Sequence, residues 1–409
     1  MAAVFPFAAV MPAPEKARQV ASPPYDVVSA QEAAQLVAGN PYAFLRVGRA
    51  EIELPADVDP YEEVVYRQAK ANYQRLTREA PLLADPQPAF YVYSLVMNGY
   101  RQTGVVATPA VDDYDTGVIK KHEKTRQQKE DDRTRHILAL RSQTGPVFLT
   151  YRDTDAIDAI VEPVMKSKPM FDFEAVDGIR HTGWRLPESN TNALRQAFGA
   201  VPALYIADGH HRAASASRTR DALRKQNPNH TGNEEYNRFL AVIFPASQLR
   251  ILPYNRVVAD LNGNTPEALL KAIADVADIE KTHEPEPPAH GSVGMYLQDQ
   301  WYRLTFPADR ENQSAVDRLD VSRLQEKVLN PLLDIRDPRT SSRVDFVGGI
   351  RGTDELEKRV REGNAAVAFS MFPTTVEELM QISDAGQIMP PKSTWFEPKL
   401  RDGLFVHNI

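Results

Sequence analysis

The chain has 409 residues, of which 42% are hydrophobic and 25% charged, as expected of a globular protein long enough to bury a full core. It has no cysteine, which excludes a disulfide scaffold, a thiol nucleophile and a thiolate metal site. The formal net charge is −7, and the richest basic region, residues 120–135, is interleaved with acidic residues. Because binding to a nucleic-acid backbone relies on clustered Lys and Arg, we expect no nucleic-acid partner.

The apolar start of the chain is not typical of a targeting segment. It is interrupted by Pro6, Pro12 and Pro14, and its first basic residue is Lys16, so we do not interpret it as a signal peptide. No window approaches the roughly 18 apolar residues of a membrane-spanning helix. We therefore expect a cytoplasmic protein with no membrane partner.

Apolar periodicity and turn residues predict helices that alternate with strands. Over the first 250 residues the predicted elements are the helix Tyr61–Arg78, the hairpin Phe90–Met97 with Tyr100–Ala107, the strand Val147–Tyr151, the hairpin Phe171–Val176 with Ile179–Leu186, the helix Thr191–Phe198 capped by Asn190, the strand Ala203–Ile206, the helix His211–Arg224 and the strand Phe239–Phe244. The remaining ones are the strand Leu249–Val258, the hairpin Gly294–Leu297 with Trp301–Phe306, the helices Val321–Leu333, Asp354–Glu362 and Thr375–Ala385, and the strands Val344–Val347 and Ala365–Phe369.

This mixture predicts an α+β (mixed α/β) protein with a mixed sheet, β-hairpins and βα units. The segment Glu284–Pro288 (EPEPP) is the best candidate for a linker. We therefore expect a main α/β domain over residues 1–283. A smaller α/β domain over residues 284–409 would end in a C-terminal strap that returns to the site.

The most informative motif is Asp208–Arg212 (DGHHR), which lies between a predicted strand and a predicted helix. The first turn of a helix has unpaired N–H groups and a positive dipole end, so an anion is stabilised there. Gly209 would let the backbone approach a phosphate closely, and Arg212 can add a bidentate fork. The alternative is a plain helix cap, with Asp208 as the N-cap and exposed His and Arg side chains.

Three further polar clusters are candidates for a site. In Ser22–Asp26 (SPPYD) two prolines fix an extended backbone that presents Tyr25 and Asp26, and the alternative is a rigid loop that caps a helix at Ser29. The second cluster, Lys120–Thr125, contains His122 and Glu123. Lys129 and Arg133 would share a face of a following helix, where the alternative is a charged surface helix. The tail, Met389–Lys399, is either a strap that packs its aromatic residues on the core or part of the site through Lys392.

The chain as a whole resembles the bacterial and archaeal family named domain of unknown function 1015. The matching stretches are SPPYDV at Ser22–Val27, HEKT at His122–Thr125, Lys129, Asp132-Arg133, YIADGHHR at Tyr205–Arg212, LPYNRVV at Leu252–Val258 and MPPKSTWFEPKLRDGL at Met389–Leu404. Members more often have His at Asn255 and Tyr at Trp395. They tend to be encoded near genes of serine biosynthesis, which implies a small hydroxylated metabolite as substrate.

A second, local resemblance covers only the DGHHR motif between its strand and helix. It looks like the phosphate-binding motif of the ParB/sulfiredoxin-like superfamily, which includes partition proteins that bind CTP, sulfiredoxins that use ATP, and free-serine kinases. The resemblance implies a phosphate-binding strand–helix junction in the middle of the chain. It also implies a nucleotide, ATP or ADP with Mg²⁺, as the cofactor.

The leading hypothesis is a nucleotide-dependent phosphotransferase, a small-molecule kinase whose acceptor is a hydroxylated metabolite such as serine. The predicted catalytic residues are His122, Glu123 and Asp208, and Asp208 and Glu123 are also the predicted Mg²⁺ ligands. The residues predicted to hold the nucleotide are Gly209, His210, His211, Arg212, Lys129, Arg133 and Lys392.

Two alternatives stay open. One is a metal-dependent hydrolase or phosphatase that uses the His, Glu and Asp cluster as ligands. The other is a nucleotide-binding module without enzymatic activity. The partners expected are the nucleotide and a small-molecule substrate, and self-association into a homo-oligomer is left open.

Overall fold

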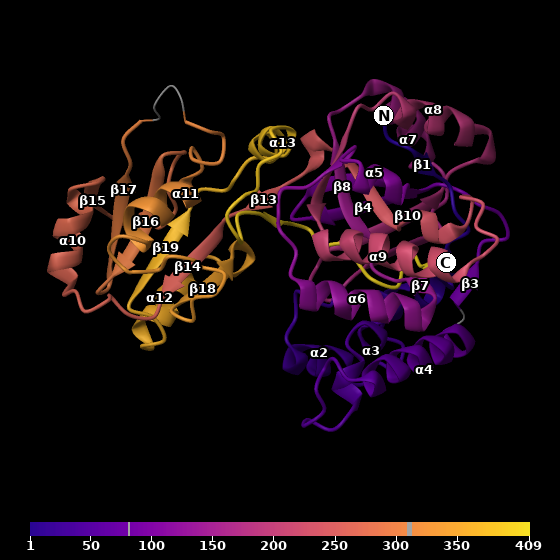
Figure 1. Cartoon of the computed structure of the whole chain (residues 1–409), viewed down its shortest axis with the longest axis horizontal. Coiled ribbons are helices and arrows are strands. Elements are labelled where there is room, and N and C mark those ends of the chain that lie inside the picture. Colours follow the sequence, from indigo (N-terminus) through magenta and orange to yellow (C-terminus); the bar gives the residue numbers. More distant parts are fainter. Residues whose placement is uncertain (81, 309–312) are drawn as a thin grey trace. The chain divides into compact units, whose positions relative to one another are not determined.

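A nine-stranded mixed sheet forms the centre of the first of two units in this computed structural model, which describes residues 1–80, 82–308 and 313–409 (Figure 1). The first unit comprises Met1–Leu249 and Pro398–Ile409, and the second comprises Arg250–Glu397. The mixed α/β class expected from the sequence is confirmed. The boundary between the units differs from the expected one at residue 283.

The strands of the first sheet run in the order β6 (Ile119–Lys120), β11 (Leu204–Asp208), β8 (Val147–Tyr151), β12 (Ala241–Pro245), β5 (Tyr100–Pro109), β4 (Tyr91–Met97), β10 (Arg180–Arg185) and β9 (Phe171–Glu174), with β1 (Val4–Phe5) beside β5. The pairs β6/β11 and β8/β12 are parallel, and the other pairs are antiparallel. Two short pairs complete the unit's strands: β2 (Val10–Pro12) with β3 (Leu82–Ala84), and β7 (Ser142–Gln143) with β21 (His407–Asn408).

The helices of the first unit are α1 (Ala17–Val20), α2 (Ala30–Val37), α3 (Leu45–Gly48), α4 (Glu63–Glu79), α5 (Val111–Asp115), α6 (Gln127–Leu140), α7 (Asp155–Val164), α8 (Thr191–Gly199) and α9 (His210–Gln226). Helix α6 packs between α9 and α4 (Figure 1). The main core buries strand residues such as Leu149 and Ile206 against Val161 of α7 and Phe198 of α8. This burial, the main favourable term in folding, fixes β11 and therefore the start of α9.

The second unit contains a six-stranded antiparallel sheet in the order β15 (Asp278–Thr282), β17 (Gln300–Thr305), β16 (Ser292–Leu297), β19 (Val367–Met371), β14 (Tyr254–Val258) and β18 (Val344–Gly348). A separate pair joins β13 (Ile251–Leu252) to β20 (Trp395–Phe396). Its helices are α10 (Pro266–Ala274), α11 (Asp320–Leu324), α12 (Asp354–Arg361) and α13 (Val376–Asp384).

Several sequence-based expectations differ from the structure. The single strand expected over Leu249–Val258 is two strands in different sheets, because Pro253 has no N–H to continue a ladder. The expected linker, Glu284–Pro288, lies inside the second unit between β15 and β16. A Cβ on Gly294 of β16 would lie 2.3 Å from the carbonyl oxygen of Pro285, so this segment packs directly on the sheet.

Two predicted helix features are also corrected. Asn190 precedes α8, but its side chain makes no capping hydrogen bond there. The helix expected over Val321–Leu333 ends as α11 and continues as one π-helical segment, Gln325–Leu329. Within the described ranges, no helix is both long enough and apolar enough to cross a membrane.

Candidate functional site

The DGHHR motif forms the junction between β11 and α9. Gly209 is the N-cap residue, with a φ of +93°, and its carbonyl accepts the first intrahelical bond, from Ala213 N–H at 3.0 Å. The N–H groups of the first turn, from His210 to Arg212, therefore have no acceptor within the helix. Together with the helix dipole they form a local positive potential that suits an anion.

Arg212 is buried beneath this turn, with only 8% of its surface exposed. One of its Nη1–H groups donates to the carbonyl of Pro146, whereas Nε has no hydrogen-bond partner among the described residues. A Cβ on Gly209 would lie 3.2 Å from this Nε, so glycine is required here by the close approach as well as by the positive φ. The plain helix cap with an exposed arginine is therefore wrong.

Arg212 lines a cavity of about 480 Å³ in the first unit. Arg133 lies in the same wall, with its guanidinium 4.0 Å from the centre of the Tyr25 ring and its Nε donating to Asp132 Oδ2 at 2.8 Å. Asp402 completes the charged part of the lining. The cavity thus brings together the partly buried Arg133 of helix α6, the buried Arg212 of helix α9 and a carboxyl group from the C-terminal strap.

The charge of Asp402 is set by its surroundings. Burial raises the pKa of its carboxyl to about 7, and the Arg212 guanidinium only partly offsets this effect. Its Oδ1 has no hydrogen-bond partner within the described part of the chain. The pKa of Arg212 is lowered by burial but raised more by Asp26 and Asp208, so the guanidinium stays charged.

A second cavity of about 530 Å³ shares Tyr25 and Arg133 with the first. Lys129 lies in its lining, and the Lys129 ammonium is 5.5 Å from the centre of the Tyr61 ring. Tyr66 O–H donates to Asp132 Oδ1 at 3.0 Å and so holds the carboxylate that pairs with Arg133. The two cavities offer positive charge next to aromatic rings, a combination suited to a phosphorylated ligand with a planar group.

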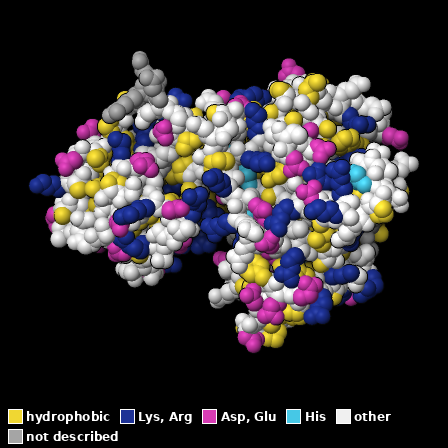
Figure 2. Space-filling model, viewed as in Figure 1, with side chains coloured by type: hydrophobic (Ala, Val, Ile, Leu, Met, Phe, Trp, Pro, Cys, Tyr) yellow, Lys and Arg dark blue, Asp and Glu magenta, His cyan; other side chains and the backbone are white. Residues whose placement is uncertain are grey.

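The alternative interpretation of Lys129 and Arg133, a charged surface helix, describes only the outer face of α6. Figure 2 shows acidic and basic side chains interspersed over the visible face of the first unit. On that part of α6, Arg135 pairs with Glu63, and Asp131 pairs with Arg218 of α9. Arg133 instead points inward.

Two histidines from separate motifs meet at the start of α9. Strands β6 and β11 are parallel and in register, so the segments that follow them run side by side. The rings of His122 and His210 are 4.4 Å apart, and the His122 backbone N–H lies 3.5 Å from Nε2 of His210. Burial lowers the pKa of His122 and lowers that of His210 to about 3, so both rings are neutral at pH 7. His211 points elsewhere and accepts from Arg126 N–H at 3.0 Å.

The two predicted catalytic carboxylates have different environments. Asp208 Oδ2 pairs with Lys399 Nζ at 3.0 Å, and Oδ1 accepts from Gly209 N–H at 2.7 Å. Burial raises the pKa of Asp208, but Lys399 and Arg212 reverse this, and the pKa lies well below its usual value. Glu123 is 40% exposed, with Oε2 3.7 Å from Nδ1 of His210. Asp208 is thus a fixed anion, and Glu123 is an accessible one.

The first unit therefore contains nearly all of the predicted site residues. These are His122, Glu123, Asp208, Gly209, His210, His211, Arg212, Lys129 and Arg133. Lys392 belongs to the second unit, with its ammonium 5.5 Å from the centre of the Tyr254 ring, and its contact with a nucleotide stays a prediction.

Sequence reasoning did not select Asp402, Gly145 or His136 as site residues, although all three line the first cavity. Asp402 lies in one of the stretches that carry the family resemblance, and this was the only available signal. A Cβ on Gly145 would lie 2.8 Å from Asp402 Oδ1, so this glycine makes room for the carboxyl group.

The described residues do not form an evident metal site. No group of three or more His, Asp and Glu side chains among them is arranged to hold a metal ion. Both oxygens of Asp208, a predicted Mg²⁺ ligand, are already engaged by Lys399 and by the backbone.

Comparison with known proteins places the chain in a family. A family model described as "Protein of unknown function (DUF1015)" matches residues 4–322. The chain belongs to this family. No curated protein sequence matches it.

Solved structures similar to this chain include a free serine kinase in complex with AMP, at 14% identity and a TM-score of 0.36, covering 73% of this chain and 91% of that one. A conserved hypothetical protein from Pyrococcus furiosus also matches at 14% identity and a TM-score of 0.36, over 74% and 95% of the two chains. A C-terminally truncated SbnI from Staphylococcus aureus matches at 14% identity and a TM-score of 0.40, over 74% and 87%.

Proposed function

We propose that the first unit binds the phosphates of a nucleotide, ATP or ADP, and transfers a phosphoryl group to a small hydroxylated metabolite, with serine as the leading candidate. The observation that carries this proposal is Arg212. It is a nearly buried arginine whose Nε–H has no acceptor among the described residues, and it lines a cavity at the start of α9. A buried donor without a partner costs free energy, and a phosphate oxygen would satisfy it.

Several groups can neutralise the phosphates in this arrangement. The N–H groups of His210 and His211 offer partial positive charge, and Arg212 and Arg133 offer full charges. Lys129 in the adjoining cavity would pair with a further phosphate, and the Tyr61 ring beside it could stack on the base. Phosphoryl transfer needs such positioning and charge neutralisation more than covalent catalysis.

Of the two predicted catalytic carboxylates, Glu123 is better suited than Asp208 to act as the general base. Its carboxylate is accessible, whereas Asp208 is held by Lys399 with a lowered pKa and accepts a proton poorly. In the proposed step the acceptor hydroxyl oxygen attacks the terminal phosphorus, and the bond from that phosphorus to the nucleotide's bridging oxygen breaks. The hydroxyl proton passes to Glu123. His122 and His210 would hold the Glu123 loop in place rather than transfer protons.

A Mg²⁺ ion held by the protein does not fit these residues. Asp208 would have to release Lys399 to bind a cation, and Glu123 would be the one remaining predicted ligand. The proposal therefore contains no step that depends on a metal bound by the protein's own side chains.

The test is calorimetric titration of the full chain with ATP and with ADP, followed by a phosphoryl-transfer assay with serine. Arg212→Gln should weaken nucleotide binding by roughly tenfold or more, since a charge-assisted hydrogen bond is lost. The matched control is Arg218→Gln, on the same helix but paired at the surface with Glu130 and Asp131. No nucleotide binding by the wild type, or equal binding by both variants, would refute the assignment.

The catalytic role of Glu123 needs a separate readout. Glu123→Gln should retain nucleotide affinity and lower the turnover of phosphoryl transfer by roughly 100-fold or more, the range for loss of a general base. If turnover is unchanged, Glu123 is not the base. If nucleotide affinity falls with turnover, Glu123 contributes to binding instead.

A further inference from the structure

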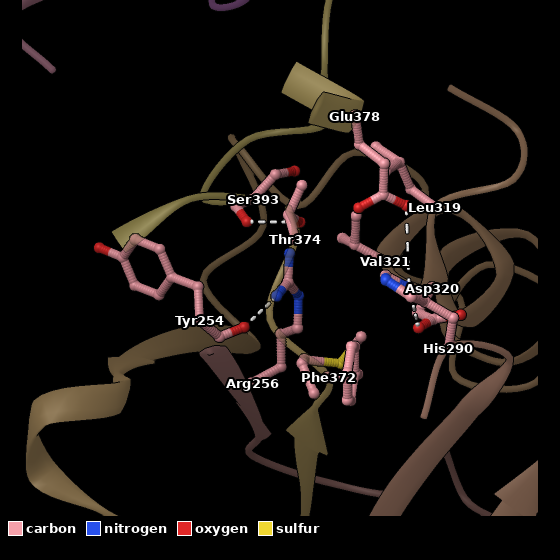
Figure 3. A pocket seen from close by; sticks show the side chains of 11 residues that line it. Tyr254, Arg256, His290, Leu319, Asp320, Val321, Phe372, Thr374, Glu378 and Ser393 are labelled. Carbon is pink, nitrogen blue, oxygen red and sulfur yellow. Dashed lines mark hydrogen bonds and ion pairs between the residues drawn. The ribbon is translucent and has the colours of Figure 1, made fainter. Parts of the chain in front are cut away.

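The second unit contains a separate, smaller cavity, shown in Figure 3. It encloses about 280 Å³ of empty space, open solvent included. Charged side chains lie on two of its sides: Arg256 of β14 on one, and Asp320 and Glu378 with His290 on the other. The function proposed for the first unit makes no use of these residues.

Arg256 is a buried cation without a carboxylate partner among the described residues. It is 3% exposed, and its fork donates to the carbonyls of Tyr254, Pro391 and Lys392, the last at 3.1 Å. These bonds account for three of the five N–H groups of a guanidinium. Burial lowers its pKa to about 10, which shows how poorly its charge is compensated. A buried charge of this kind favours an anionic ligand.

On the opposite side of the cavity, a buried carboxylate oxygen lacks a hydrogen-bond donor among the described residues. The Asp320 side chain is 4% exposed, and its Oδ1 accepts from Gly291 N–H at 2.8 Å, with Arg323 Nε 3.9 Å away. Its Oδ2 is buried without a hydrogen bond in the described part of the chain. His290 Nδ1 lies 3.4 Å from this oxygen and 3.7 Å from Glu378 Oε1, so the two carboxylates lie on either side of this ring nitrogen.

We propose that this cavity binds a small α-amino acid in its zwitterionic form, with the carboxylate at Arg256 and the ammonium group at Asp320 and Glu378. One ligand then satisfies both groups that lack a partner among the described residues, the Arg256 cation and the Asp320 oxygen. A simple anion would meet Arg256 but face the two carboxylates, and a simple amine would leave Arg256 uncompensated. The side chain would rest against apolar residues of the lining such as Val321 and Phe372.

The experiment is calorimetric titration of the full chain, without nucleotide, with L-alanine, glycine and L-serine. L-Alanine is the decisive probe because it has no hydroxyl group and cannot be the acceptor in the reaction proposed for the first unit. We expect binding of L-alanine, and binding weaker by roughly tenfold or more for propionate, which lacks the ammonium group, and for ethylamine, which lacks the carboxylate.

Variants locate the site. Arg256→Gln and Asp320→Asn should each weaken L-alanine binding by roughly tenfold or more. Glu378→Gln, whose amide can still cap α13, serves if either fails to fold. The control is Arg336→Gln, an exposed arginine of the same unit with 83% of its side chain accessible, and it should bind as the wild type does.

Three results would overturn the proposal: no binding of any of the three amino acids, propionate binding as tightly as L-alanine, or L-alanine binding that survives both Arg256→Gln and Asp320→Asn. A failure of nucleotide binding would leave this proposal unaffected, since no nucleotide is present in the titration.

Discussion

Replacing Asp402 by Asn should change how the stability of the protein depends on pH. Burial raises the pKa of this carboxyl from 3.8 to about 7 in the folded chain. Between these two values the unfolded chain has released a proton that the folded chain still holds. The free energy of unfolding therefore falls as the pH rises from about 4 to about 7, and this loss is complete above pH 7.

The magnitude follows from the size of the shift. A difference of about three pH units at about 1.4 kcal/mol each gives an upper limit of about 4 kcal/mol for the destabilisation above pH 7. Between pH 5 and pH 8 the two titration curves give about 2 to 3 kcal/mol of this loss. Asn cannot ionise, so the stability of Asp402→Asn relative to the wild type should rise by that amount over the same interval.

The assay is equilibrium unfolding in urea at pH 5 and pH 8. Trp184 is the tryptophan of the first unit, so its fluorescence reports on that unit when Trp301 and Trp395 are replaced by Phe in every protein compared. The buried histidines also contribute to the pH dependence, because they titrate in the unfolded chain over this range, but they are common to both proteins and cancel in the difference. Asp57→Asn, at an exposed position of the first unit, removes the same charge and should show no such change.

Ionisation of Asp402 should also change the affinity for the nucleotide. An ionised Asp402 beside Arg212 would repel a phosphate, so nucleotide affinity should fall as the pH rises through 7, and this fall should be absent in Asp402→Asn. The reasoning is refuted if the stability difference between the wild type and Asp402→Asn is the same at pH 5 and pH 8.

Three further predictions concern the junction and its surroundings. Gly209→Ala should cost about 1 to 2 kcal/mol of stability, because alanine is strained at this positive φ, and it should also weaken nucleotide binding. The control Gly39→Ala, at a φ of +72° in open space, should lower stability alone. Urea unfolding measures the stability and calorimetry measures the nucleotide binding. Lys399→Met should leave the Asp208 carboxylate without its cation and cost about 2 kcal/mol near pH 7, and the loss should vanish at a pH where Asp208 is protonated. His136→Gln should remove part of the acid lability of the protein. Burial lowers the pKa of His136 to about 4, so only the unfolded chain gains this proton as the pH falls from about 6.5, and unfolding at pH 5 measures the effect.

Much of the local structure is determined by the sequence alone. Two strand-like segments on either side of the turn residues Asn98-Gly99 predict the hairpin of β4 and β5. The apolar run before Asp208 predicts β11. The order of residues in DGHHR also places the motif at a strand–helix junction. These features depend on neighbours within a few residues, so short-range steric and hydrophobic patterns are sufficient to specify them.

The tertiary structure alone decides which distant residues meet. His122 lies beside His210 because the two-residue strand β6, too short to predict, pairs in parallel with β11. Asp402 reaches the cavity of Arg212 because the last residues of the chain return to the first unit. Such contacts follow from strand order and from burial of the whole core, which a local pattern does not encode. The same is true of the buried Nε of Arg212, which has no hydrogen-bond partner among the described residues and on which the proposed function of the motif depends.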